Sequence, residues 1–377
     1  MSALSTYAEI NLKSITHNFK AIKKIVRPNT RVMAVVKANA YGHGIVEIAN
    51  EMAKSGADYL GVARFEEAVI LREADVRLPI LIFGYTSRSQ FEKLCHYDIT
   101  QTIYSLEDAK ILSDCALSLA KCAKIHIKID TGMGRLGMIP DNLHKLSNEI
   151  ADIARLKCLD IEGIFTHFAS ADGLDKSYTR YQFDVFTDLL ESLGQRGITI
   201  PLKHAANSAA IIDLPETHLD MVRLGISLYG LYPSQHVLKD KVNLLPAMEL
   251  KSHIIHLKNV SSGFKISYGS TYETSRPTII ATVPVGYADG YNRLLSSKGI
   301  MLVNGNRVPV VGRVCMDLAM LDVGDLGSDI RVEDEVVVFG HQGNASVSID
   351  EIAELLDTIN YEIVTSVTSR VKRVYIS

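Results

Sequence analysis

The sequence has 377 residues, enough for two or three domains, and its 47% apolar and 22% charged residues match a folded globular protein. Lysine and arginine number 40 against 43 aspartates and glutamates, a net charge of -3. This balance argues against a partner that is nucleic acid or a membrane surface.

The cysteines and the apolar runs indicate where the chain resides. The five cysteines are odd in number and never spaced C-x-x-C, which favours reduced thiols in the cytoplasm over disulfides or a zinc site. We expect no signal peptide, because the N-terminus lacks a basic region followed by an apolar core. No apolar stretch approaches the ~18 residues of a membrane span.

The first two-thirds of the chain alternates short apolar runs with amphipathic segments. The predicted strands are 32–36, 57–63, 79–83, 99–104, 123–130, 159–166, 198–204 and 221–225. The predicted helices are 12–26, 44–55, 65–75, 106–121, 139–156 and 177–195. Eight strands joined by helical crossovers favour a (β/α)8 barrel over residues 1–240. An open doubly wound sheet is the alternative, but the G-x-G-x-x-G fingerprint after the first strand is absent.

The pattern changes near residue 240. Apolar β-type runs broken by turn residues follow, at 250–260, 278–285, 300–303, 308–311 and 335–339. Asn304 and Gly305 predict a hairpin turn, and Ser348 predicts the cap of a late helix at 348–358. Residues 241–377 are therefore predicted to form a second, mainly β domain.

Lys37 is the first candidate for chemistry. It stands at the C-terminal end of the first predicted strand, the end where barrel enzymes build their sites, and small residues and glycines follow it. A desolvated lysine there can act as a base, or as a nucleophile that forms a Schiff base with an aldehyde. The alternative is an ordinary surface lysine.

The strand at 124–130 alternates isoleucines with ionisable residues, so one of its faces is polar. In a barrel the isoleucines would face the helices and Lys128 would point inward, where it needs a partner or a neutralising change. Asp130 is one possible partner, and carbamylation of Lys128 is a second possibility. An edge strand with a wet face remains the alternative.

Further polar residues follow at the same predicted rim. The glycine-rich loop 131–137 presents Arg135, which suits a carboxylate or a phenolic oxygen. His167 ends the sixth strand and Arg223 lies in the eighth. Asn207 and Ser208 open a helix after the seventh strand, and barrels commonly bind phosphate in the loops after strands seven and eight.

The second domain carries tyrosines beside glycines, which individually are typical of turn packing. They lie in Ser267-Tyr268-Gly269 and Gly286-Tyr287-Ala288-Asp289-Gly290, and further on come Val314-Cys315-Met316-Asp317 and Asn360-Tyr361. No spacing here matches a metal site, a G-x-S-x-G elbow or a P-loop.

Taken together, these motifs resemble the pyridoxal-phosphate-dependent alanine racemases. The resemblance is carried, in family order from Lys37 to Tyr361, by V-K-A-N-A-Y-G-H-G, K-I-D-T-G-M-G-R-L-G, T-H-F-A, N-S, R-L-G-I, Y-G, P-V-G-Y-A-D-G, V-G-R-V-C-M-D and I-N-Y. Leu318 departs from the glutamine found in many members, at a position without a chemical role.

The resemblance implies a barrel plus a C-terminal β domain in a homodimer, with active sites shared between the barrel of one chain and the β domain of the other. Lys37 would hold pyridoxal 5'-phosphate and act as the base on one face, and Tyr268 of the partner chain as the base on the other. Arg223 would face the pyridine nitrogen, and His167 would connect Arg223 to Tyr268.

The remaining implied roles concern binding. Residues expected to hold the phosphate or its surroundings are Tyr41, Asn207, Ser208, Gly225, Ile226 and Tyr361. Arg135 and the Met316 backbone would position the substrate carboxylate, with carbamylated Lys128 orienting Arg135. Tyr287 would lie in the entrance region, and Cys315 and Asp317 would support the site.

The implied activity is racemisation of L- and D-alanine, which in this family supplies peptidoglycan synthesis. Because a proton leaves one face of the α-carbon and returns on the other, two bases on opposite sides are needed. The alternatives are a barrel-fold decarboxylase, a pyridoxal-phosphate carrier without turnover, and a serine-preferring racemase. The second domain argues against the carrier, and Tyr361 favours a small methyl side chain.

Overall fold

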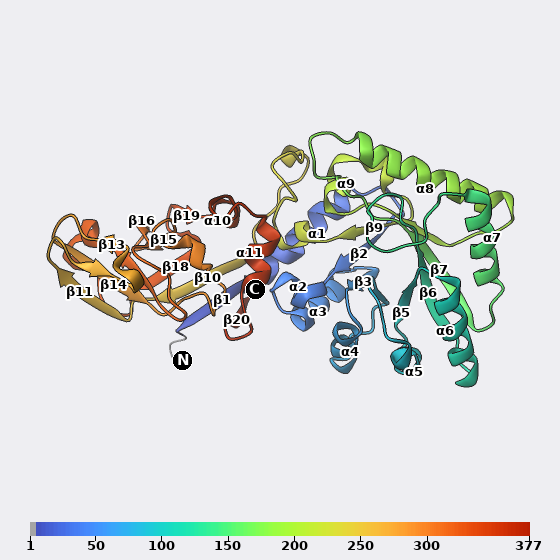
Figure 1. Ribbon diagram of the computed structural model, residues 1–377, viewed down its shortest axis with the longest axis horizontal. Helices are drawn as coiled ribbons and strands as arrows, with labels where there is room; N and C mark the ends of the chain where they lie inside the picture. The colour runs from blue at the N-terminus through green and yellow to red at the C-terminus, as the bar shows by residue number, and fades with distance from the viewer. Residues whose placement is uncertain (1–4) are drawn as a thin grey trace. The chain divides into compact units, whose positions relative to one another are not determined.

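The computed structural model describes residues 5–377, so the first four residues, part of the stretch expected to lack a signal peptide, lie outside it. The chain forms two compact units. The barrel unit comprises Ser14–Ala40 and Ile45–Leu245. The β unit comprises the described residues up to Lys13, Tyr41–Gly44 and Pro246–Ser377. Figure 1 shows the helices around the strands of the barrel unit and the strand-rich β unit.

The barrel unit contains all eight predicted parallel strands. They are β2 (Arg31–Val35), β3 (Tyr59–Val62), β4 (Ile80–Ile82), β5 (Thr100–Ile103), β6 (Ala123–Lys128), β7 (Leu159–Phe165), β8 (Leu202–His204) and β9 (Met221–Leu224). The helices are α1 (Leu12–Ile25), α3 (Ile45–Ser55), α4 (Phe65–Glu73), α5 (Phe91–His96), α6 (Leu106–Ser118), α7 (Leu143–Ala154), α8 (Ser177–Gln195) and α9 (Ser208–Asp213). The sequence analysis did not predict the short helix α5, but it did predict that a helix, now seen as α9, begins at Asn207 and Ser208.

The strand order is β8-β7-β6-β5-β4-β3-β2-β9, and two backbone hydrogen bonds bridge the remaining seam between β8 and β9. Asp220 N donates to Lys203 O over 3.1 Å, and Arg223 N donates to Ala206 O over 3.0 Å. The sheet is therefore a barrel, as predicted, and the open doubly wound sheet is wrong.

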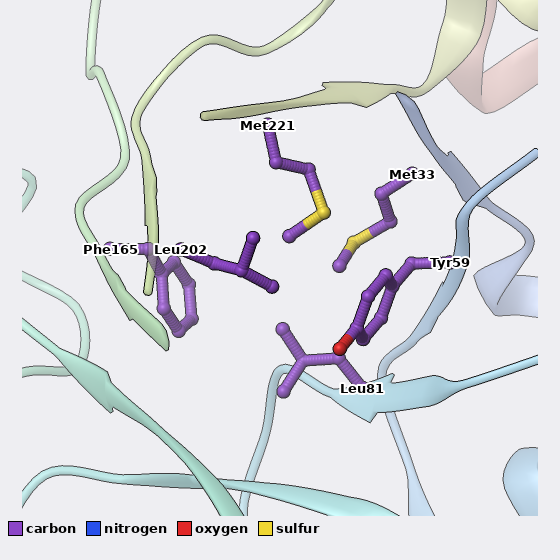
Figure 2. Close-up of a cluster of buried hydrophobic side chains, with 6 residues drawn as sticks. All are labelled: Met33, Tyr59, Leu81, Phe165, Leu202 and Met221. Atoms are coloured by element: carbon purple, nitrogen blue, oxygen red, sulfur yellow. The ribbon is translucent and has the colours of Figure 1, made fainter. Parts of the chain in front are cut away.

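Large apolar side chains fill the barrel interior. Six of them, each from a different strand, converge in Figure 2: Met33, Tyr59, Leu81, Phe165, Leu202 and Met221. All six are at most 6% exposed, so this layer is a packed core and not a channel.

The β unit is built on a seven-stranded sheet of order β16-β15-β18-β10-β1-β20, with β19 added on β18. These strands are β1 (Thr6–Asn11), β10 (Met248–His253), β15 (Ile300–Val303), β16 (Asn306–Pro309), β18 (Glu335–Gln342), β19 (Ala345–Val347) and β20 (Lys372–Ile376). A second sheet joins β11 (His256–Val260), β14 (Thr278–Val283) and β17 (Ala319–Asp322). The remaining elements are β12 (Lys265–Ile266), β13 (Tyr272–Glu273), α10 (Ile349–Leu355) and α11 (Asn360–Ser366).

Local signals for the β unit are confirmed at the turn and the cap. Asn304 and Gly305 both have positive φ and join β15 to β16 as a two-residue hairpin, which shifts the second strand two residues earlier than expected. Ser348 accepts the Glu351 N–H at 3.0 Å and begins α10. The sequence analysis missed β1, whose residues pair with β10 and β20, strands more than 200 residues away. Within residues 5–377, no helix combines the length and apolar character needed to cross a bilayer.

Candidate active site

Lys37 lies just after β2 and is followed by a left-handed helical turn. Residues 38–40 have φ of 52°, 54° and 53° with ψ of 51°, 47° and 51°, and Tyr41 continues at φ 52°. Each non-glycine residue in this conformation costs about 1–2 kcal/mol, and such residues normally occur singly. A run of four must be held by its surroundings, and strain of this kind concentrates at functional sites.

Three hydrogen bonds within the barrel unit hold this turn. The Ala40 N–H donates to Val36 O over 2.8 Å. The Ala38 N–H donates to Oε1 of Glu67 over 2.6 Å, and the Ile45 N–H donates to the Asn39 side chain over 2.9 Å. The backbone that carries Lys37 is thereby fixed on both sides of the turn.

The Lys37 amine is half-buried in this setting. Burial lowers the pKa of Lys37, the Arg135 cation lowers it further, and the Glu67 carboxylate opposes both effects. A lowered lysine pKa increases the neutral amine available to accept a proton or to bond covalently with a carbonyl compound.

Lys128 is buried on β6 and its amine has no hydrogen-bond partner among the described residues. Its Nζ lies 4.5 Å from the centre of the Phe165 ring. Burial, then Arg223 and then Arg135 place the pKa of Lys128 well below its ordinary value. Asp130, one of the two options for neutralising Lys128, makes no hydrogen bond with it, although its charge opposes this lowering of the pKa.

Asp130 instead organises the glycine-rich loop. Its carboxylate accepts the N–H groups of Gly132 and Gly134 at 3.0 Å each and that of Arg135 at 2.9 Å. Burial is the largest single influence and raises the pKa of Asp130, but the backbone hydrogen bonds together outweigh it and lower the pKa. The loop therefore presents Arg135, which is exposed, from a fixed backbone.

Arg223 is 4% exposed and pairs with no carboxylate in residues 5–377. Nη2 donates to the carbonyls of Thr166 (2.8 Å) and Ala205 (2.7 Å) and to Nδ1 of His167 (3.1 Å). Nη1 donates to Nδ1 of His204 over 2.9 Å. Burial lowers the pKa of Arg223 to about 9, which leaves the guanidinium cationic at neutral pH.

These contacts set the proton positions of three histidines, because a guanidinium can only donate. Nδ1 of His167 and of His204 must accept, so each carries its proton on Nε2. His204 then donates to Nδ1 of His126 over 2.9 Å, which leaves the His126 proton on an Nε2 that finds no partner in the described chain. Burial and the nearby cations lower the pKa of all three, that of His126 to about 3, so the histidines are neutral.

Ser208 and the turn after β9 form a small polar cradle. Ser208 Oγ accepts the N–H of Gly225 at 2.9 Å and that of Ser227 at 3.4 Å, which leaves its own proton free to be donated. The Ser227 hydroxyl is buried without a hydrogen bond in the part of the chain described. Asn207 caps α9 by accepting the Ala210 N–H at 3.1 Å. Ile226, between the two N–H donors, is buried.

The β unit brings together the other predicted site residues in two places. Tyr41 and Tyr361 are neighbours, with ring centres 6.1 Å apart. Tyr287 N donates to Cys315 O over 3.1 Å, and Ala288 N donates to Met316 O over 3.0 Å, so the two sequence motifs meet.

Close packing between the two motifs explains why residue 286 is a glycine. A Cβ on Gly286 would lie 2.2 Å from Met316 O, so only glycine fits. The Ser267 hydroxyl, which precedes Tyr268, donates to Arg313 O over 2.7 Å and lies 3.6 Å from Cys315 Sγ.

The chemical groups of this second cluster face outward. Tyr268 is 70% exposed and Met316 53%. Asp317 is held by Arg370 Nη2 over 2.8 Å. Such exposure suits side chains that act on a surface outside their own unit.

The sequence analysis assigned no role to His126, His204 or Glu67. His204 lies at the end of a barrel strand, much as His167 lies just after one. This position could have identified His204 as a candidate site residue from the sequence. His126 is one of the polar residues of the strand at 124–130. Nothing in the local sequence predicts the contact of Glu67 with Ala38, because the two residues are 29 positions apart.

Family models, related sequences and solved structures all indicate the same family for this chain. Residues 10–233 match the model "Alanine racemase, N-terminal domain" and residues 247–375 the model "Alanine racemase, C-terminal domain". An alanine racemase of Methanococcus maripaludis is 52% identical over 98% of both chains, and one of Desulforamulus reducens is also 52% identical over 98% of both. The solved alanine racemase of Clostridium difficile 630 matches with a TM-score of 0.95 at 44% identity, covering 100% of this chain and 97% of that one. The predicted resemblance is confirmed: the chain belongs to the alanine racemase family.

Proposed function

We propose that this protein is an alanine racemase that interconverts L- and D-alanine with pyridoxal 5'-phosphate, as a cytoplasmic homodimer supplying D-alanine for peptidoglycan. The observation that carries the proposal is the full-length similarity to proteins named alanine racemase, two of them at 52% identity. A racemase is an isomerase, because substrate and product differ only in configuration. The decarboxylase and carrier alternatives lose their support with this family assignment.

The residues of the barrel unit suit the cofactor. A half-buried lysine with a lowered pKa can bond covalently with an aldehyde, and Lys37 supplies it. Arg223 is a buried cation without a carboxylate partner, and a permanent donor there keeps an acceptor nitrogen unprotonated. The free Ser208 proton and the turn at Gly225 and Ile226 offer polar contacts to a phosphate.

Further cofactor contacts are proposed from the resemblance to the family. Residues proposed to hold the phosphate or its surroundings are Tyr41, Asn207, Ser208, Gly225, Ile226 and Tyr361, while Arg223 and His167 flank the ring. When bound, pyridoxal phosphate withdraws electrons from the α-carbon of alanine and makes its proton more acidic.

The chain then has to handle one proton on each face of the α-carbon. Lys37, whose pKa is lowered by burial and by Arg135, is the base on one face. Tyr268 of a second copy is the base on the other face, which its exposure in a single chain permits. His167 carries its proton on Nε2 and can donate it to the Tyr268 oxygen, thereby stabilising the phenolate that a base requires.

Substrate binding is assigned to residues that do not move protons. Arg135 and the Met316 backbone hold the alanine carboxylate, and carbamylated Lys128 orients Arg135. Tyr287 lies in the entrance region, with Cys315 and Asp317 supporting the loop that carries Met316. In this proposal residues 1–240 bind the cofactor and residues 241–377 complete the active site of the partner.

The test combines a spectrum with a chiral assay. The purified protein, supplied with pyridoxal phosphate, should absorb near ~420 nm, and borohydride should bleach the band and fix the label on the Lys37 peptide. L-alanine should yield D-alanine, and L-serine should react more slowly. Lys37→Ala should lose both band and turnover, whereas the exposed Lys24→Ala should keep them. A band without any D-alanine would reject the racemase.

A further inference from the structure

Glu67 receives three backbone N–H groups from two separate parts of the barrel unit. Its Oε2 accepts from Ala63 (2.8 Å) and Arg64 (3.1 Å), which caps the first turn of α4. Its Oε1 accepts from Ala38 over 2.6 Å, the residue directly after Lys37. One carboxylate therefore joins the start of a helix to the left-handed turn, and none of the roles proposed above uses it.

The Ala38 bond lies where the turn needs an outside restraint. The turn's internal bond, from Ala40 N to Val36 O, leaves the Ala38 N–H pointing outside the turn. Nothing in the local sequence favours positive φ at two alanines, since neither is glycine or asparagine. A charged acceptor forms a stronger bond to an amide than a neutral one does, so the carboxylate is an effective restraint.

The charge of Glu67 also bears on the Lys37 amine. The Glu67 carboxylate raises the pKa of Lys37 and so favours its protonated form, and the Arg135 cation acts in the opposite sense. An acid that holds the backbone directly after Lys37, and whose charge acts on the amine, can influence both its position and its protonation.

We infer that Glu67 is a positioning residue for Lys37, which holds the strained turn through Ala38 and offsets the Arg135 cation at the Lys37 amine. The importance of this role for catalysis rests on the proposed function, in which Lys37 is a base. The contacts themselves do not depend on that function.

The test uses three variants of the full-length chain. Glu67→Gln removes the charge and leaves an amide that can accept at only one end. Glu67→Asp keeps the charge and an acid at the third position of α4, but its shorter side chain cannot bridge to Ala38. Glu66→Gln is the matched control, because Glu66 is the exposed neighbouring acid and its carboxylate binds the Gln90 side chain instead.

The first readout is the reactivity of Lys37 in protein prepared without cofactor. Trinitrobenzenesulfonate labels neutral amines, and peptide mass spectrometry follows Lys37 as the pH is varied. In Glu67→Gln the midpoint of the labelling curve should move to lower pH, and the labelling rate at pH 7.5 should rise about twofold or more. Glu66→Gln should match the wild type. Loss of a helix cap alone would leave the midpoint in place, so equal midpoints for Glu67→Gln and Glu66→Gln overturn the inference.

The second readout is amide hydrogen exchange in the peptide containing Ala38. Exchange should be several-fold faster in Glu67→Asp than in Glu66→Gln, while α4 stays protected. Because this variant retains the cap, it serves even if Glu67→Gln does not fold. Unchanged exchange at Ala38 in Glu67→Asp overturns the inference.

These outcomes are separate from those of the proposed function. A shifted Lys37 midpoint in a protein that makes no D-alanine would reject the racemase and keep the role of Glu67. An active racemase in which the Lys37 midpoint does not shift and the Ala38 amide does not exchange faster would keep the proposed function and reject the role of Glu67.

Discussion

Nη2 of Arg223 lies 3.1 Å from Nδ1 of His167, and this bond determines which nitrogen of the imidazole carries the proton. The guanidinium has no acceptor, so Nδ1 is unprotonated and Nε2–H is free to donate. The same argument applies to His204 on the other arm of Arg223. Arg223 is therefore a buried cation whose hydrogen-bond partners are all neutral imidazoles and carbonyls. Its positive charge remains available to interact with a ligand.

Replacing Arg223 should change the outcome of the reaction as well as its rate. Arg223→Glu places an acid where the ring nitrogen is proposed to bind, and the acid would favour a protonated ring that withdraws electrons more strongly. Racemisation should fall by about 100-fold or more, and pyruvate from transamination should rise relative to D-alanine. Arg223→Lys, which keeps the charge, should lose rate without this change in partition. Equal partition in all three proteins would contradict the assigned role.

Tyr268→Phe should separate the two faces of the reaction. With one base removed, deuterium from solvent should enter only one of the two alanine enantiomers, because the Lys37 face still exchanges its proton. Racemisation should fall by about 100-fold or more. The measurement is NMR of alanine incubated in D₂O with each enantiomer. Tyr272→Phe, a nearby tyrosine on β13, is the control, and exchange lost or kept equally for both enantiomers would count against two bases.

Lys128 should carry a carbamate, formed when its neutral amine adds carbon dioxide and releases a proton. The lowered pKa supplies that neutral amine, and the product gives the buried side chain an anion for Arg135. Holoenzyme in ¹³C-labelled bicarbonate should show a carbamate resonance that Lys128→Ala lacks and Lys124→Ala retains. The KM of Lys128→Ala for alanine should rise about tenfold, with a smaller change in kcat. Absence of the resonance from the wild type would refute the modification.

The buried histidines should make folding sensitive to acid. Unfolded histidines gain protons as the pH falls through about 6.5, but His126, His167 and His204 in the folded chain stay neutral to much lower pH, for His126 to about 3. The unfolded state then binds more protons, so the free energy of unfolding decreases as the pH falls below 6.5. Denaturant unfolding should show a loss of about 1 kcal/mol or more between pH 7 and pH 5.5. His126→Gln should reduce this slope and the exposed His236→Gln should not; parallel curves for His126→Gln and wild type would disprove the explanation.

Two glycines should respond oppositely to alanine. A Cβ on Gly163 would lie 2.6 Å from the His126 ring, which His204 holds in place, so Gly163→Ala should destabilise the fold by about 1–3 kcal/mol. Gly194, in α8, has nothing within 4 Å of such a Cβ, and Gly194→Ala should stabilise by up to about 1 kcal/mol. Thermal unfolding measures both, and a neutral Gly163→Ala would show that the His126 ring can move.

The sequence by itself determined the elements with strong local patterns. All eight barrel strands, the longer helices, the Asn304–Gly305 hairpin and the Ser348 cap follow from apolar periodicity and turn chemistry, which act over a few residues. Most candidate site residues were also found from sequence, because barrel enzymes place them at the C-terminal ends of strands, so Lys37, His167 and Arg223 could be identified by position.

Only the tertiary structure decided the relationships between distant residues. Strand β1 exists because β10 and β20 pair with it, and its own short, mixed sequence does not specify a strand. Asp130 could be placed beside Lys128 by sequence, but its carboxylate is taken by the loop that follows. The left-handed turn after Lys37, the bond from Ala38 to Glu67 and the proton positions of the histidines arise from contacts between different strands, helices and loops of the barrel unit. Such contacts depend on how the whole chain closes, since the local backbone preferences of the residues oppose or ignore them.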